Sequence, residues 1–153
     1  MKKALALLVS LILIFGITVT ASAASTAVSL NGVPNELKKG ERATVTVSLA
    51  NSPEADSALI QFTLDNGLEL VSGEWKTGGM IEDFNLAERE GVMTVASLKT
   101  FNGTVFSFVV SGKNASASAQ NITVKLTLKN GTADVGTATA TKSVKITCSA
   151  HTY

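Results

Sequence analysis

The sequence predicts an all-β fold, a two-sheet β-sandwich of about nine short strands, and two observations predict it. Short runs in which apolar and polar residues alternate recur along the chain, and turn residues such as Asn-Gly separate them. Such alternation places apolar side chains on one face of each strand, so that one face of each sheet is buried and the other is solvated. Helical periodicity is almost absent, which argues against a mixed α/β fold.

The rest of the chain is organised around residues 58–75. Ile60, Phe62 and Leu64 alternate with polar residues there, which is the pattern of a half-buried strand. Asp65-Asn66-Gly67 supplies a turn, because Asn and Gly tolerate positive φ angles. Leu68 and the residues after it resume the apolar pattern, so the chain turns here and returns to the core.

The remaining strands are expected on the same grounds. The first lies at a sheet edge, because Pro34 follows it and lacks an amide donor. The segment after Trp75 forms a short strand rather than a helix, since Gly78-Gly79 and Gly91 flank it. The last strand places Val144 and Ile146 inward. These strands are expected at residues 26–30, 43–49, 80–86, 92–98, 104–110, 122–129 and 142–147, with an exposed loop at 113–120 and a weakly patterned run at 132–141.

The N-terminus has the features of a secretory signal peptide spanning residues 1–23. Lys2 and Lys3 precede the apolar run 4–19, and Ala21-Ser22-Ala23 is a small-residue cleavage site. The alternative is an uncleaved membrane anchor, but no basic flank follows the apolar run. The sequence therefore predicts a secreted protein with one domain at residues 24–148 and a C-terminal tail at 149–153.

Charge and cysteine content narrow the function classes. The full chain has 13 basic and 12 acidic residues. Removal of Lys2 and Lys3 with the signal peptide leaves one basic residue fewer than acidic residues, so the net charge of the mature chain is slightly negative. Nothing therefore favours nucleic acid or an anionic membrane as a partner. The single cysteine, Cys148, forms no internal disulfide, and the domain depends on packing alone. Cys148 is either an interchain link or a small residue on the last strand.

Four segments together resemble the cohesin domain family. They are Lys39–Leu49, Ile60–Asp65, Leu68–Gly73 and Phe106–Val110, and they match the family's strand patterns over almost the whole domain. The resemblance implies a nine-stranded jelly roll with immunoglobulin-like topology. In cohesins, one sheet face of this fold binds the calcium-loaded dockerin of a polysaccharide-degrading enzyme. Related carbohydrate-binding modules share the same sandwich.

Catalytic residues are not recognisable, so we expect no enzyme activity and no cofactor. The one histidine, His151, lies three residues from the C-terminus, where it cannot serve as the base of a catalytic triad. The carboxylate pairs Glu82 with Asp83 and Glu88 with Glu90 are typical of a solvated loop. The turn at residues 65–67 lacks the further acidic ligands of a calcium loop, so no metal site is expected.

Two kinds of binding surface remain open. Trp75 is the best candidate for stacking on a sugar ring, with Phe84 and Phe101 behind it, although a single Trp is also typical of a core. A protein-docking face is expected from a different set of residues, and its alternative is a plain solvated sheet. That set is Gln61, Thr63, Thr94, Ser97 and Lys99.

The sequence thus predicts a non-catalytic binding module whose partner is a dockerin-type protein or a polysaccharide, in extracellular polysaccharide degradation. Two alternatives stay open. One is a structural surface, matrix or adhesin-type subunit that associates with its own copies through sheet edges. The other is a stand-alone carbohydrate-binding module.

Overall fold

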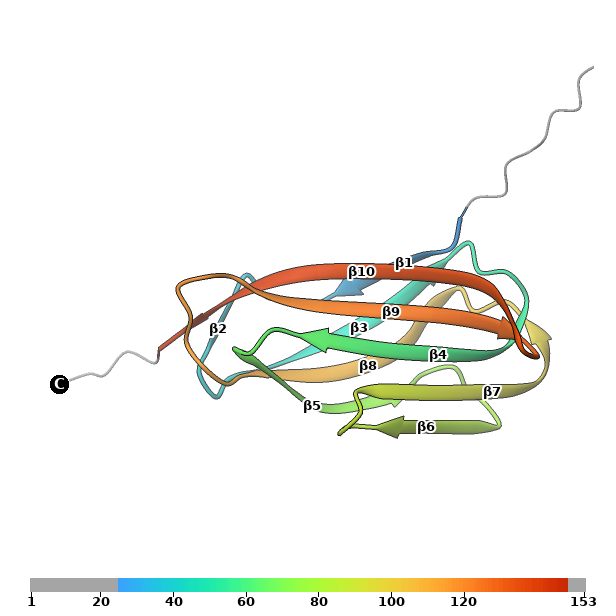
Figure 1. Ribbon diagram of the computed structural model, residues 1–153, viewed down its shortest axis with the longest axis horizontal. Coiled ribbons are helices and arrows are strands. Elements are labelled where there is room, and N and C mark those ends of the chain that lie inside the picture. The colour runs from blue at the N-terminus through green and yellow to red at the C-terminus, as the bar shows by residue number, and fades with distance from the viewer. Residues whose placement is uncertain (1–24, 149–153) are drawn as a thin grey trace, which may run out of the picture.

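The computed structural model describes residues 25–148, which form two facing β-sheets (Figure 1). No helix in this range is long and apolar enough to cross a membrane. The predicted signal peptide and C-terminal tail lie outside the described residues. The strands are β1 (Ala27–Asn31), β2 (Glu36–Lys38), β3 (Arg42–Ala50), β4 (Ala55–Leu64), β5 (Leu68–Trp75), β6 (Ile81–Asn85), β7 (Glu90–Lys99), β8 (Gly103–Gly112), β9 (Gln120–Asn130) and β10 (Ala133–Thr147). The prediction of an all-β sandwich is confirmed.

The two sheets contain four and six strands. The four-stranded sheet has the order β1-β3-β8-β5, and the six-stranded sheet has the order β2-β10-β9-β4-β7-β6. All strand pairs are antiparallel except β2 with β10, which is parallel. The strand around which the sequence is organised, β4, lies between β9 and β7 at the centre of the larger sheet. The first strand, β1, lies at an edge, as Pro34 predicts.

The core lies between the sheets and is built by the alternation seen in the sequence. Inward residues of the central strands are almost completely buried, whereas the residues between them face outward. Because each strand buries every second residue, two sheets of this length provide a continuous apolar layer. Its main members are Val45, Val47, Leu49, Ile60, Phe62, Leu64, Phe106, Phe108, Val110, Ile122, Val124, Leu126 and Leu128.

Aromatic rings close the core at the β5 and β6 side. The Phe62 ring centroid lies 4.9 Å from that of Phe108, and the Phe106 centroid lies 5.0 Å from that of Trp75. Phe84 of β6 adds an edge-on contact to Phe106 at 5.3 Å. These tilted and edge-to-face contacts add to the stability that burial of the rings provides.

The last strand differs from the prediction, because β10 begins at Ala133 rather than at Lys142. Its threonines face outward, whereas Ala138 and Ala140 face the core side, in register with β9. Alanine carries too little apolar surface for this alternation to stand out in the sequence. Val144 and Ile146 do point inward, as predicted. Cys148 is exposed and follows the end of β10 instead of lying on the strand.

Candidate functional site

The outer face of the six-stranded sheet brings together three of the five predicted docking residues. Gln61 and Thr63 lie on β4, on the side opposite to the buried Phe62. Thr94 of β7 pairs with Ser57 of β4. Ser57 lies on the same side of β4 as Gln61, so Thr94 is on the same outer face. The register of β4 and β7 therefore places these polar side chains on one surface.

The other two predicted docking residues lie at its margin. The β4–β7 register is interrupted between Ser57 and Ala55, and Ser97 lies in the β7 segment that bulges there. The ammonium group of Lys99 donates to the Thr77 carbonyl oxygen at 3.3 Å. It also lies 5.1 Å from the centroid of the Phe101 ring. The Lys99 side chain is thus directed to the end of the sandwich.

A row of apolar residues crosses the same outer face and was missed by sequence reasoning. Leu59 of β4 pairs with Val92 of β7. Ile81 of β6 pairs with Thr94, two residues along β7, and is therefore the diagonal cross-strand neighbour of Val92. Val92 is 41% exposed and Ile81 is 61% exposed. We call these three residues the apolar row. The signal that could have identified it is the presence of apolar residues at both odd and even positions of β4 and β7.

Polar and charged groups surround the apolar row. The Gln61 side-chain amide donates to a Glu90 carboxylate oxygen at 2.9 Å, which holds both side chains on the sheet. A shallow hollow of about 260 Å³ adjoins this pair and is lined by groups of both charge signs. Its lining residues are Gln61, Phe62, Thr63, Glu88, Arg89, Glu90, Thr123 and Lys125.

The outer face of the four-stranded sheet has a different character. Its central strands present Thr44 and Thr46 of β3 opposite Val109 and Ser107 of β8. Among the described residues, none of the large exposed apolar side chains belongs to this sheet. The two faces of the sandwich are therefore unequal, and only the larger sheet combines an apolar centre with a polar surround.

Comparison with known proteins places the fold. No protein-family model matches the sequence, and no curated protein matches it either. A cohesin module of a family 33 glycoside hydrolase from Clostridium perfringens superposes with a TM-score of 0.64 at 11% identity, covering 82% of this chain and 98% of that one. The chain has a cohesin-like fold.

Further cohesins are similar to this cohesin-like domain. A non-cellulosomal cohesin from Archaeoglobus fulgidus has a TM-score of 0.56 at 14% identity, over 81% of this chain and 92% of that one. A cohesin in a type I cohesin–dockerin complex from Clostridium thermocellum has a TM-score of 0.50 at 13% identity, over 84% of this chain and 99% of that one. At these identities the likeness concerns the fold.

The aromatic residues predicted for sugar stacking mostly belong to the core of the cohesin-like domain. Trp75 is 6% exposed and Phe101 is 4% exposed. The Trp75 indole nitrogen donates to the Asp83 carbonyl oxygen at 3.0 Å, so both the ring and its polar atom are engaged. Phe84 is partly buried against the same cluster. Trp75 and Phe101 offer no exposed ring face to a sugar, and we do not propose them as ligand-binding residues.

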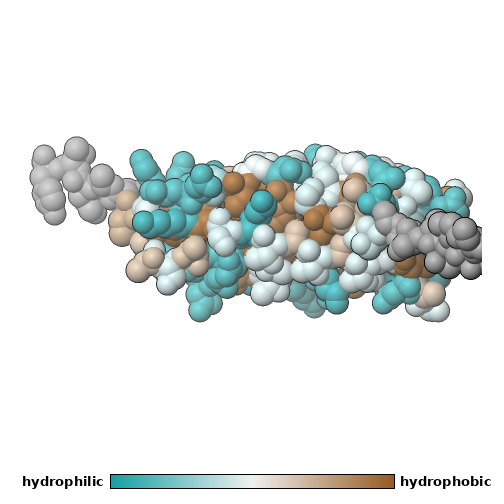
Figure 2. All heavy atoms as spheres, turned by 90° about the horizontal axis from the view of Figure 1, so that it is seen from above, coloured by the Kyte–Doolittle hydropathy of each residue, from teal (hydrophilic) through white to brown (hydrophobic). Residues whose placement is uncertain are grey.

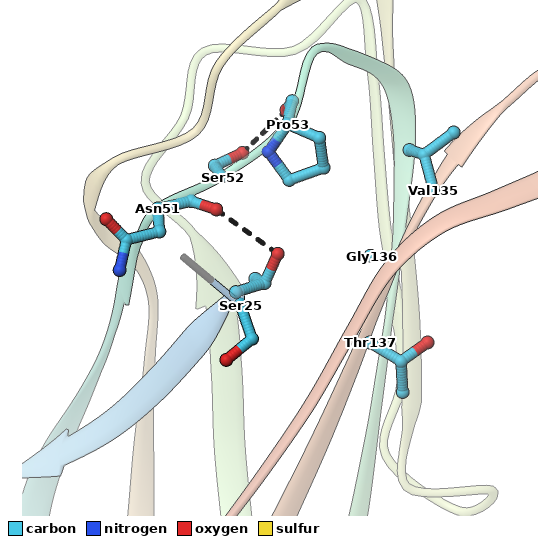
Figure 3. Close-up of a pocket in the computed structure, with 8 residues that line it drawn as sticks. Ser25, Asn51, Ser52, Pro53, Val135, Gly136 and Thr137 are labelled. Atoms are coloured by element: carbon cyan, nitrogen blue, oxygen red, sulfur yellow. Dashed lines mark hydrogen bonds between the residues drawn. The ribbon is translucent and has the colours of Figure 1, made fainter. Parts of the chain in front are cut away.

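The cohesin-like domain has a second hollow at one end, of about 610 Å³, where the start of β1 meets the β3–β4 turn and the β10 bulge (Figure 3). The Thr26 hydroxyl donates to the Asn51 carbonyl oxygen at 3.2 Å across it. Small polar and apolar residues line this hollow, with no charged side chain among them. Within residues 25–148 no cluster of three His, Cys, Asp or Glu side chains could hold a metal ion.

Proposed function

We propose that this chain is a secreted, non-catalytic binding module that docks a dockerin-type protein in extracellular polysaccharide degradation. The docking face is the outer surface of β9, β4, β7 and β6. The observation that carries the proposal is the apolar row of Leu59, Val92 and Ile81 inside a polar surround, on a domain with a cohesin-like fold.

The composition of this face suits a protein interface of ordinary kind. Such interfaces have an apolar centre that is fully desolvated in the complex and a polar rim that stays hydrated. Val92 and Ile81 are exposed in the free domain and gain most from being covered. Gln61 and Glu90 supply donors and acceptors at the rim, already oriented by their mutual hydrogen bond.

A protein partner is better supported than a polysaccharide. Flat sugar rings are usually bound by exposed aromatic faces, and the rings of Trp75 and Phe101 are buried. A sheet surface with an aliphatic row instead resembles the centre of a protein interface. The dockerin class is proposed because a cohesin of similar fold was solved in complex with a dockerin.

The test is capture of secreted proteins from the source organism by the immobilised chain from Ala24 onward. Capture is run with calcium and again with a chelator, because a dockerin is expected to be loaded with calcium. We expect an identified dockerin-bearing enzyme to be retained only with calcium. Retention of the same proteins in both buffers, or retention of none, would contradict the dockerin class.

Two lysine variants locate the surface. Val92→Lys introduces an ammonium group into the apolar row, and we expect the affinity for the captured partner to fall by about tenfold or more, which corresponds to about 1.4 kcal/mol. Thr44→Lys makes the same kind of change on the outer face of the four-stranded sheet, where Thr44 is exposed. An equal loss in both variants, or a loss in Thr44→Lys alone, would show that the docking face is assigned to the wrong sheet.

A further inference from the structure

The outer edge of β10 has no strand partner over most of its length. Residues 133–144 pair with β9 on one side, whereas β2 covers only residues 145–147 on the other. β1 runs beside β10 along the upper side of Figure 1 but belongs to the opposite sheet. Within the described chain, the backbone groups of β10 that point away from β9 are therefore available to pair with another strand.

The other free edges of the sandwich are short or charged, whereas the middle of β10 is neither. The edge strand β6 has five residues and carries Glu82 and Asp83. At the opposite sheet, β1 has five residues, and β5 carries Glu69 and Glu74 and a register shift. Charges, irregular register and short length all hinder unintended pairing. Residues 136–141 of β10, Gly-Thr-Ala-Thr-Ala-Thr, contain no charge and no proline.

Partly buried apolar side chains accompany this edge. Figure 2 looks onto the side where β1 and β10 lie next to each other and shows an apolar strip along the molecule. Val28 of β1 packs against the core there and is only partly buried, as are Ala138 and Ala140 of β10. A strand added to β10 would cover these side chains while pairing its backbone.

We propose that two copies of this chain associate by antiparallel pairing of their β10 edges about a twofold axis at Thr139. In this register Thr137 lies opposite Thr141 of the second copy on the outer face. Ala138 lies opposite Ala140 of the second copy on the core side. The two six-stranded sheets become one continuous sheet, and the apolar strip beside each β10 is covered.

The edge is self-complementary in this arrangement, which favours a second copy over an unrelated strand. A twofold interface uses the same patch on both partners, so each residue must tolerate its symmetry mate. Threonines opposite one another stabilise a sheet, and the Thr123 and Thr141 hydroxyls are already within 3.0 Å of each other across β9 and β10. Lys142 lies opposite Gly136 of the second copy, so no like charges meet.

The extent of pairing is set at the start of β10. A register shift separates Asp134 from Gly136, and the segment around Gly136 packs against Pro53 and Thr26 at the hollow of Figure 3. A Cβ atom at Gly136 would lie 2.8 Å from the Thr26 hydroxyl and 3.1 Å from a Pro53 ring carbon. The register shift before Gly136 therefore ends the free edge, and pairing runs from Gly136 to Lys142. The docking face begins at β9, the strand next to β10, and remains free.

Sedimentation velocity of the chain from Ala24 onward tests the proposal, with Cys148→Ser in every sample to exclude disulfide dimers. We expect a reversible dimer whose fraction grows from micromolar to near-millimolar protein. Thr139→Lys places two ammonium groups against each other at the twofold axis, and we expect it to abolish the dimer. Thr44→Lys, at an exposed position of β3, is the matched control and is expected to leave the dimer unchanged.

A cross-linking variant keeps the test decisive if Thr139→Lys fails to fold. In the Cys148→Ser background, Thr139→Cys is expected to form a disulfide-linked dimer under mild oxidation, and Thr44→Cys is expected to stay monomeric. A monomer at every concentration would overturn the proposal. So would a dimer that survives Thr139→Lys, a dimer lost equally in both lysine variants, or cross-linking that does not distinguish the two cysteine positions.

Discussion

Trp75 is a structural tryptophan rather than a ligand-binding one, and its replacement gives a quantitative prediction. The indole is 6% exposed, and its ring lies at 87° to the Phe106 ring with the centroids 5.0 Å apart. Truncating a buried Trp to Ala usually costs about 3–5 kcal/mol. Because Trp75 also donates to the Asp83 carbonyl oxygen, we expect Trp75→Ala to lower the free energy of unfolding by about 4 kcal/mol.

Trp75→Phe separates the two contributions. Phenylalanine retains an aromatic ring against Phe106 but has no N–H group to donate. The Asp83 carbonyl belongs to an exposed residue of the edge strand β6, so water can replace the lost donor. We therefore expect Trp75→Phe to cost only about 1–2 kcal/mol, mainly from the hydrogen bond and the smaller ring.

Urea unfolding followed by far-UV circular dichroism measures both variants against the parent chain, with Thr44→Ala as an exposed control on β3. The parent chain gives an independent check, because Trp75 is its one tryptophan. Its native fluorescence should be protected from acrylamide and become accessible in urea. Unchanged unfolding midpoints for Trp75→Ala, or native quenching as efficient as in urea, would refute the assignment of Trp75 to the core.

Two further predictions concern close approaches in the core. A Cβ atom at Gly73 would lie 2.7 Å from the Phe106 ring, so Gly73→Ala is expected to destabilise the domain by about 1–3 kcal/mol in urea unfolding, whereas the exposed neighbour variant Ser72→Ala stays near zero. The buried Gln120 side chain accepts from the Gly67 amide at 2.8 Å. Gln120→Ala leaves that amide without its partner and should cost about 1–3 kcal/mol; an unfolding midpoint equal to that of the parent would show that the contact is dispensable.

The fold could be predicted where strands alternate large apolar and polar residues. This holds for β3, β4 and β9, whose inward Val, Leu, Ile and Phe side chains carry a strong signal. It fails for the first part of β10, where alanine and threonine differ too little in hydrophobicity. It fails also for β2, whose three residues are too few to show a period and which is held by pairing with the distant C-terminal end of β10.

The candidate site was harder to predict than the fold. Outward polar positions such as Gln61 and Thr63 follow from strand alternation alone. The apolar row does not, because it depends on which strands become neighbours. Val92 is beside Leu59 only through the pairing of β7 with β4, and a register is not encoded in either strand separately. Trp75 shows the same limitation, since its burial depends on the rings of β6 and β8.

The parallel pairing of β2 with β10 determines how the domain would respond to mechanical tension. β1 begins at the end of the sandwich opposite to the end at which β10 stops (Figure 1). A pulling force between the two ends would therefore draw β2 and β10 along their length in opposite directions. The Lys39 amide donates to the Thr147 carbonyl oxygen at 2.8 Å, and the Lys145 amide donates to the Asn35 carbonyl oxygen at 3.0 Å. These bonds would be loaded together in shear rather than opened one after another. The β2–β10 pair would therefore resist extension more than a β-hairpin whose strands are pulled apart from one end.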